Sequence, residues 1–100
     1  MKRASVDVDV EAVARRVEEC PGIASLSSGP VGLAASYLPG KRVEGVRVTD
    51  DLVEVHVVAR WGVTTQAVDR EVRGAASSMT AGRRLDVFIE DVDVPAALLR

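Results

Sequence analysis

The stretch Val53-Glu54-Val55-His56-Val57-Val58-Ala59-Arg60-Trp61-Gly62 decides the fold of this 100-residue chain. Valine or alanine occupies every second position from 53 to 59, which predicts a strand with one face against a core. Trp61-Gly62 breaks this alternation, and apolar residues then recur at helical spacing at positions 68, 72, 75, 76 and 79. The second pattern predicts an amphipathic helix on the same core. A long strand that turns into a long helix therefore fixes the architecture.

The composition describes one small domain without a strong charge. Hydrophobic residues make up 47% of the chain, and most of them are valine, alanine and leucine. The 13 basic and 15 acidic residues give a net charge of −2, so no basic excess is present to hold nucleic acid by counterion release. A single cysteine excludes an intramolecular disulfide. No apolar run approaches the roughly 18 residues of a membrane span, and no signal peptide is recognisable, so we expect a soluble, cytoplasmic protein.

Two helices are predicted from apolar spacing and from end signals. The first has about 10 residues, with Asp7 or Asp9 as its N-cap and Pro21-Gly22 as its end. The second begins at about residue 65, with Thr64 or Thr65 as N-cap, and ends near Met79. Both present a valine-rich stripe, and both stripes need a sheet to cover them.

Four strands are predicted, over residues 23–27, 43–49 and 52–60 and from Leu85 onward. A turn at Asp50-Asp51 makes the second and third strands antiparallel neighbours. In the last strand the apolar phase slips, which predicts a bulge near Glu90-Asp91. Residues 31–42 fit two alternatives, a short helix or a mobile apolar loop.

These elements predict an α+β fold, a two-layer sandwich in the order helix, strand, strand, strand, helix, strand. The sheet is expected to be small and mostly antiparallel, with the two helices packed against it. We expect an N-terminal tail over residues 1–7, one domain over 8–94, and a C-terminal tail over 95–100, because Pro95 ends strand pairing.

The chemistry-bearing residues form no recognisable catalytic, cofactor or metal motif. His56, the only histidine, is expected on the outward face of its strand as a surface residue. Glu54 could orient it as a general base, and Cys20 would then be the nucleophile of a small hydrolase or transferase. The hydrolase or transferase is the weakest of three functional hypotheses for this chain. Cys20 lies far from His56 in sequence, and it fits a half-buried apolar position at a helix end. Trp61 follows the register of Ala59, so it is expected to cap the core, and the alternative is an exposed tryptophan at an interface.

A second hypothesis is a small nucleic-acid-binding module. Gly29-Pro30-Val31-Gly32 matches the GxxG string with which KH domains clamp a nucleic-acid backbone. Its middle lacks the usual basic residue, however, and chance readily produces such a string. The basic pairs Arg15-Arg16, Lys41-Arg42 and Arg83-Arg84 would support binding only if they converged in space.

Several longer runs resemble the alkaline shock protein family of bacterial envelope-stress proteins. The runs are Gly45-Val46-Arg47-Val48, Leu52 to Val63, Ala67-Val68-x-x-Glu71-Val72, Ala75-x-x-x-Met79-Thr80 and Leu85-x-Val87-x-Ile89-x-x-Val92. The likeness covers roughly residues 8–94. Trp61 replaces the family's usual tyrosine, and residues 28–42 do not match.

The resemblance implies a non-enzymatic scaffold of the envelope stress response that needs no cofactor. Such a protein self-associates, as a homo-oligomer, or docks on a membrane-anchored protein partner at the cytoplasmic face of the membrane. We expect the interface to include Leu52 and Val58, on the outward register of the long strand, and Tyr37 and Leu38, in the apolar segment before Pro39-Gly40. Nucleic acid is not expected as a partner.

Overall fold

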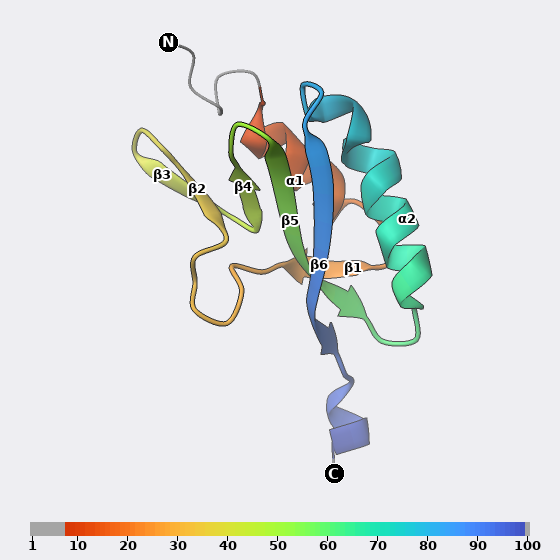
Figure 1. Ribbon diagram of the computed structural model, residues 1–100. Coiled ribbons are helices and arrows are strands. Elements are labelled where there is room, and N and C mark those ends of the chain that lie inside the picture. The colour runs from red at the N-terminus through yellow and green to blue at the C-terminus, as the bar shows by residue number, and fades with distance from the viewer. Residues whose placement is uncertain (1–7, 100) are drawn as a thin grey trace.

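The structure, a computed structural model, describes residues 8–99 and has an α+β architecture with two helices on one face of a mostly antiparallel sheet (Figure 1). This confirms the predicted fold class. The elements are α1 (Val10–Glu18), β1 (Ile23–Leu26), β2 (Ala35–Leu38), β3 (Lys41–Glu44), β4 (Val46–Val48), β5 (Leu52–Arg60), α2 (Thr65–Ala76) and β6 (Arg84–Asp93). A short 3-10 turn follows α2 at Ser77–Met79. A second 3-10 turn lies at Ala96–Leu99, within the segment that was expected to be a loose tail. The predicted tail over 1–7, with the candidate cap Asp7, lies outside the described residues.

Strand β5 organises the sheet because it pairs with three others. Along one edge it is antiparallel to β4 over Val53–Val55 and to β1 over Val57–Ala59. Along its other edge it runs parallel to β6 over its whole length. Val57 pairs with Ile89 and Val58 with Asp91, so the predicted bulge is present and Glu90 is the extra residue.

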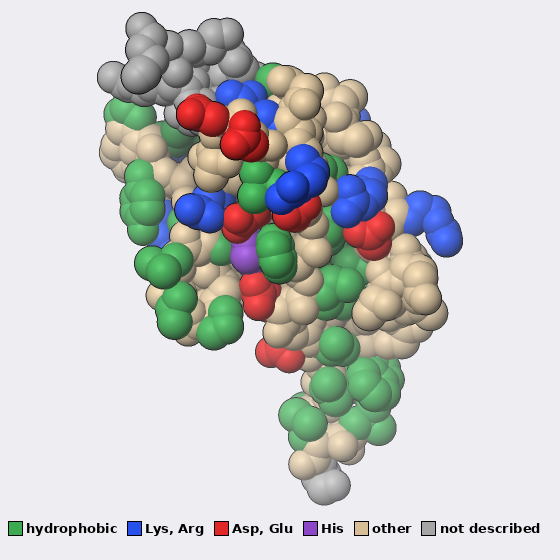
Figure 2. Space-filling view, in the orientation of Figure 1, with side chains coloured by type: hydrophobic (Ala, Val, Ile, Leu, Met, Phe, Trp, Pro, Cys, Tyr) green, Lys and Arg blue, Asp and Glu red, His purple; other side chains and the backbone are tan. Residues whose placement is uncertain are grey.

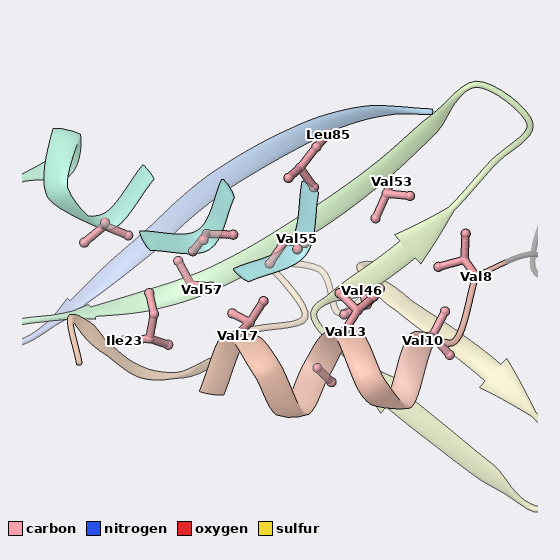
Figure 3. Packing of buried hydrophobic residues seen from close by; sticks show 14 of the residues in the cluster. Val8, Val10, Val13, Val17, Ile23, Val46, Val53, Val55, Val57 and Leu85 are labelled. Atoms are coloured by element: carbon pink, nitrogen blue, oxygen red, sulfur yellow. The ribbon is translucent and has the colours of Figure 1, made fainter. Parts of the chain in front are cut away.

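The core lies between the helices and the sheet (Figure 3). Its largest fully buried side chains are Val13, Val17, Ile23, Val46, Val53, Val55, Val57, Val68 and Val72. The inward residues of β5 belong to the predicted alternation, and both helical stripes meet them on the same face of the sheet. Because all of these side chains are β-branched, they suit the strands and pack as a tight layer under the helices.

Both helices begin at a predicted N-cap. Asp9 Oδ1 accepts a hydrogen bond of 3.1 Å from the backbone N–H of Ala12, and Thr64 Oγ1 accepts one of 3.1 Å from that of Ala67. Each bond satisfies a backbone donor that the first helical turn leaves unpaired.

Residues 31–42 form neither the short helix nor the mobile loop that the sequence left open. Strands β2 and β3 make an antiparallel hairpin in which Leu38 pairs with Lys41 across Pro39-Gly40. Gly40 has a φ of +76°, and proline followed by glycine suits the two central positions of a tight turn. The Pro-Gly signal therefore outweighed the apolar spacing.

The single strand predicted over 43–49 is also wrong, because Gly45 divides it into β3 and β4. Gly45 has a φ of +82°. Its N–H donates to Ala34 O at 2.7 Å, and its carbonyl accepts from His56 N at 2.8 Å. One glycine thus redirects the chain from the hairpin into the sheet.

The core position predicted for Trp61 is wrong as well, since its side chain is 55% exposed. Strand β5 ends at Arg60, and Trp61-Gly62 forms a turn in which Gly62 has a φ of +87°. The turn takes Trp61 out of the strand register, and Val63 packs against the core instead.

Candidate functional site

One group of side chains points away from the helices and forms a surface that we call the open sheet face. It consists of Arg47 from β4, Glu54 and His56 from β5, and Phe88 and Glu90 from β6. Figure 2 shows the histidine at the centre of this face, with acidic side chains on both sides and a hydrophobic side chain beside it. The parallel register places His56 opposite Phe88, and their rings stack with centroids 4.5 Å apart at an angle of 11°.

His56 holds a carboxylate at each of its ring nitrogens. Its Nε2 lies 2.9 Å from Glu54 Oε1, and its Nδ1 lies 2.5 Å from Glu90 Oε2. Arg47 Nη1 donates to the second oxygen of Glu54 at 2.9 Å. The open sheet face therefore carries a continuous ionic chain from Arg47 through Glu54 and His56 to Glu90.

The number of protons in this chain follows from the hydrogen bonds. A neutral imidazole has one N–H and can donate to only one carboxylate. Two bonds need two protons, held either by an imidazolium or by a neutral imidazole with one protonated glutamate. With an imidazolium, His56 and Arg47 together balance the charges of Glu54 and Glu90. The network is then neutral as a whole.

The prediction that His56 is a plain surface residue is wrong, because only 8% of it is exposed. Phe88 covers one side of its ring, and the two glutamates cover both edges. Neither Phe88 nor Glu90 is near His56 in sequence. Only the parallel pairing of β6 with β5 brings them there, so the sequence carried no local signal for this arrangement.

A hollow of about 440 Å³ lies beside the network, under the loop between β1 and β2. The loop is held in place by hydrogen bonds from Ser27 N to His56 O, 2.9 Å, and from Ala34 N to Ser28 O, 2.9 Å. Its outer wall is an apolar rim that consists of Pro30, Val31 and Leu33. Figure 2 shows hydrophobic side chains gathered to the left of the histidine, over this part of the fold.

The hollow gives little support to the hydrolase or transferase hypothesis. Ser28 lines it, but carboxylates occupy both nitrogens of His56, so neither is free to take a proton from a hydroxyl. Cys20 lies in the helical layer, on the other side of the sheet, where its thiol donates to Glu71 O at 3.5 Å. Among residues 8–99, no three histidine, cysteine or acidic side chains are arranged to hold a metal ion.

Burial raises the pKa of the Cys20 thiol, and the nearby charges of Glu71 and Glu19 raise it further. Cys20 is half-buried at the end of α1, as predicted from the sequence. A raised pKa disfavours the nucleophilic thiolate. The structure therefore does not bring together the three residues of that hypothesis.

The features behind the nucleic-acid hypothesis are dispersed as well. The Gly29–Gly32 string lies in a loop between two strands, whereas the KH clamp joins two helices. Lys41 pairs with Glu11 at 2.6 Å, and Arg84 pairs with Asp86 at 3.1 Å. Arg15, Lys41 and Arg42 line a common hollow, but Glu11, Glu18 and Glu44 line it too. Among residues 8–99, these basic pairs therefore form no concentrated basic surface.

The predicted interface residues lie at different places. Leu52 and Val58 are half-buried on the outward register of β5, in line with His56. Tyr37 is 73% exposed, and the guanidinium of Arg42 lies 5.9 Å from its ring centroid. Leu38 is half-buried and packs against the core. Sequence reasoning did not select Val31, Leu33 or Phe88, which are more exposed than most apolar residues of this chain.

No helix within the described part of the chain is long and apolar enough to cross a membrane. Comparisons with protein-family models, with curated proteins and with solved structures find no match to this chain. The resemblance to the alkaline shock protein family therefore stays a prediction from the sequence.

Proposed function

We propose that this chain is a non-enzymatic scaffold protein that binds another protein through the open sheet face and the apolar rim. The observation that carries the proposal is the exposure of three large apolar side chains around the paired charges. Val31 is 76% exposed, Leu33 is 74% exposed and Phe88 is 41% exposed. Apolar side chains that gather on one face mark sites of association more often than isolated ones do.

The charges of the open sheet face suit a surface that becomes covered. Each of the four ionic side chains in the network, Arg47, Glu54, His56 and Glu90, already has a partner within the protein. A docking protein would therefore bury no unpaired charge. Burial of an unpaired charge is strongly unfavourable, because the ion loses its water without gaining a partner. A partly exposed aromatic ring on this face also suits a binding site, because aromatic side chains are enriched at the cores of protein interfaces.

The resemblance to the alkaline shock protein family suggests the cellular setting of this proposal. In that setting the protein works in the bacterial envelope stress response, at the cytoplasmic face of the membrane. It associates with itself or docks on a membrane-anchored protein. The half-buried Leu52 and Val58 extend the same face along β5, so they remain part of the proposed interface.

Light scattering of the purified protein and affinity capture from gently solubilised cells test this function together. Leu33→Glu places a charge on the rim without touching the core, so it should abolish association and leave the circular dichroism spectrum unchanged. Trp61→Ser is the matched control, because Trp61 is a similarly exposed apolar residue outside the proposed interface.

Two results would count against the scaffold. The first is a wild-type protein that stays monomeric at high concentration and captures no protein partner. The second is salt-dependent binding of RNA or DNA by the wild type, unaffected by Leu33→Glu, which would favour the nucleic-acid module instead.

A further inference from the structure

The outer edge of β6 is free of strand partners among residues 8–99. This strand has 10 residues and pairs with β5 along one edge only. Arg84 N donates to Asp51 O at 3.1 Å, so the backbone groups of Arg84 point toward β5. Backbone groups alternate between the two edges of a strand, so those of Leu85, Val87 and Ile89 point to the free edge. Leu85 O confirms this direction, because it accepts a hydrogen bond of 2.8 Å from Arg73 of α2.

A groove of about 860 Å³ runs between this edge and α2. Its lining consists of Thr65, Gln66, Asp69, Arg70, Arg73, Gly74, Ser77 and Ile89. Figure 1 shows α2 beside β6, on the side away from β5. A Cβ atom added at Gly74 would meet no atom within 4 Å, so the wall of the groove is open at its middle.

The groove carries an excess of positive charge. Arg73 Nε binds both carboxylate oxygens of Asp69, at 3.1 and 3.0 Å, so these two charges offset each other. The side chain of Arg70, one turn along the same wall, is exposed and makes no hydrogen bond or ion pair with any described residue. An occupant with acidic side chains would complement Arg70 and could share Arg73.

The position of α2 also limits the size of the occupant. A second copy that joined its β6 to this edge in the antiparallel direction would carry its own helices on the same side of the extended sheet. Those helices would meet α2, which already projects past the edge (Figure 1). A single extended segment has no such conflict, because one strand adds only about 5 Å to the width of the sheet.

We propose that the β6–α2 groove binds an extended acidic segment of another protein as an added strand. The segment pairs with the backbone groups of Val87 and Ile89 and with the N–H of Leu85, whose carbonyl already accepts from Arg73. Its acidic side chains face Arg70 and Arg73. Backbone hydrogen bonds supply affinity in this mode of recognition, and alternate side chains supply specificity. The site adjoins the open sheet face at Phe88, but its pairing edge and its arginines lie outside that face, so it does not depend on the function proposed for it.

The probe for this site is a fluorescein-labelled peptide of about eight residues, a common strand length, in which glutamate alternates with valine. One face of such a strand presents all its carboxylates to α2, and the other lies beside Phe88 on the sheet. We expect saturable binding that weakens with salt, with amide chemical-shift changes at Leu85, Val87 and Ile89. A peptide with lysine in place of glutamate, and one with N-methyl groups on alternate residues, should not bind.

Variants of the groove separate binding from folding. Arg70→Glu should weaken binding about tenfold at low salt, since an attractive exposed pair becomes repulsive. Gly74→Glu should weaken binding too, and it should not unfold the protein because glutamate is a better helix former than glycine. Gly74→Ala is the matched control and should bind like the wild type.

Three outcomes would overturn the proposed site. They are no binding of the glutamate peptide by the wild type, equal binding of the lysine peptide, and shift changes confined to the loop over His56. None of them bears on the association measured for Leu33→Glu, so this proposal and the scaffold function can fail separately.

Discussion

Gly45→Ala tests whether the junction between the hairpin and the sheet is as closely packed as the structure shows. Gly45 has a φ of +82°, and a Cβ atom there would lie 2.8 Å from both His56 O and Leu26 Cβ. The backbone cannot move aside freely, because hydrogen bonds to Ala34 and His56 hold Gly45 on both sides. Gly40→Ala is the matched control, since Gly40 has a φ of +76° and open space around it.

The difference between the two variants isolates the steric contact. Both place alanine in the left-handed region, which costs about 1–2 kcal/mol, and both lose the flexibility of glycine in the unfolded chain. Gly45→Ala adds an overpacking cost of about 1–3 kcal/mol. In a domain of this size, about 1 kcal/mol lowers the melting temperature by about 4–8 °C. Gly45→Ala should therefore melt about 8–16 °C below Gly40→Ala for an added cost of about 2 kcal/mol.

Thermal unfolding followed by circular dichroism measures this difference directly. NMR spectra of Gly45→Ala should also show altered signals for His56 and Phe88, because His56 N donates to the carbonyl that moves. Equal melting temperatures for the two alanine variants would refute the steric argument and the junction geometry on which the open sheet face depends.

Two further predictions concern the helical layer. Cys20 should react with iodoacetamide more slowly in the folded protein than in the unfolded chain at mildly alkaline pH. The reason is that burial, Glu71 and Glu19 raise the pKa of its thiol. Glu71→Gln should speed the reaction, which mass spectrometry follows. The folded state favours the neutral thiol of Cys20. The resulting contribution to the free energy of unfolding is complete below the ordinary thiol pKa of about 8.5, and it is lost as the pH rises through the raised pKa of the folded state. Thr64→Ala should lower the free energy of unfolding by about 1 kcal/mol in urea titrations, and a Thr64→Ser variant that loses as much would contradict the cap.

The candidate site shows where local sequence signals end. The alternation from Val53 to Ala59 predicts correctly that His56 faces away from the helices. The same pattern does not predict whether other side chains on that face cover His56. His56 is buried because a strand some 30 residues later pairs in parallel and delivers Phe88 and Glu90 to its sides.

The sequence by itself determined the two helices, the long strand β5 and a bulge near Glu90-Asp91, because each follows from periodicity or from bonds between near neighbours. Tertiary structure alone decided the burial of His56, the exposure of Trp61 and the groove beside β6. These depend on which strand pairs with β5 and in what register, and that choice is made by contacts between residues far apart in the chain. The hairpin lies between the two cases, since Pro39-Gly40 signals its turn locally and Gly45 is fixed only by the strands that it joins.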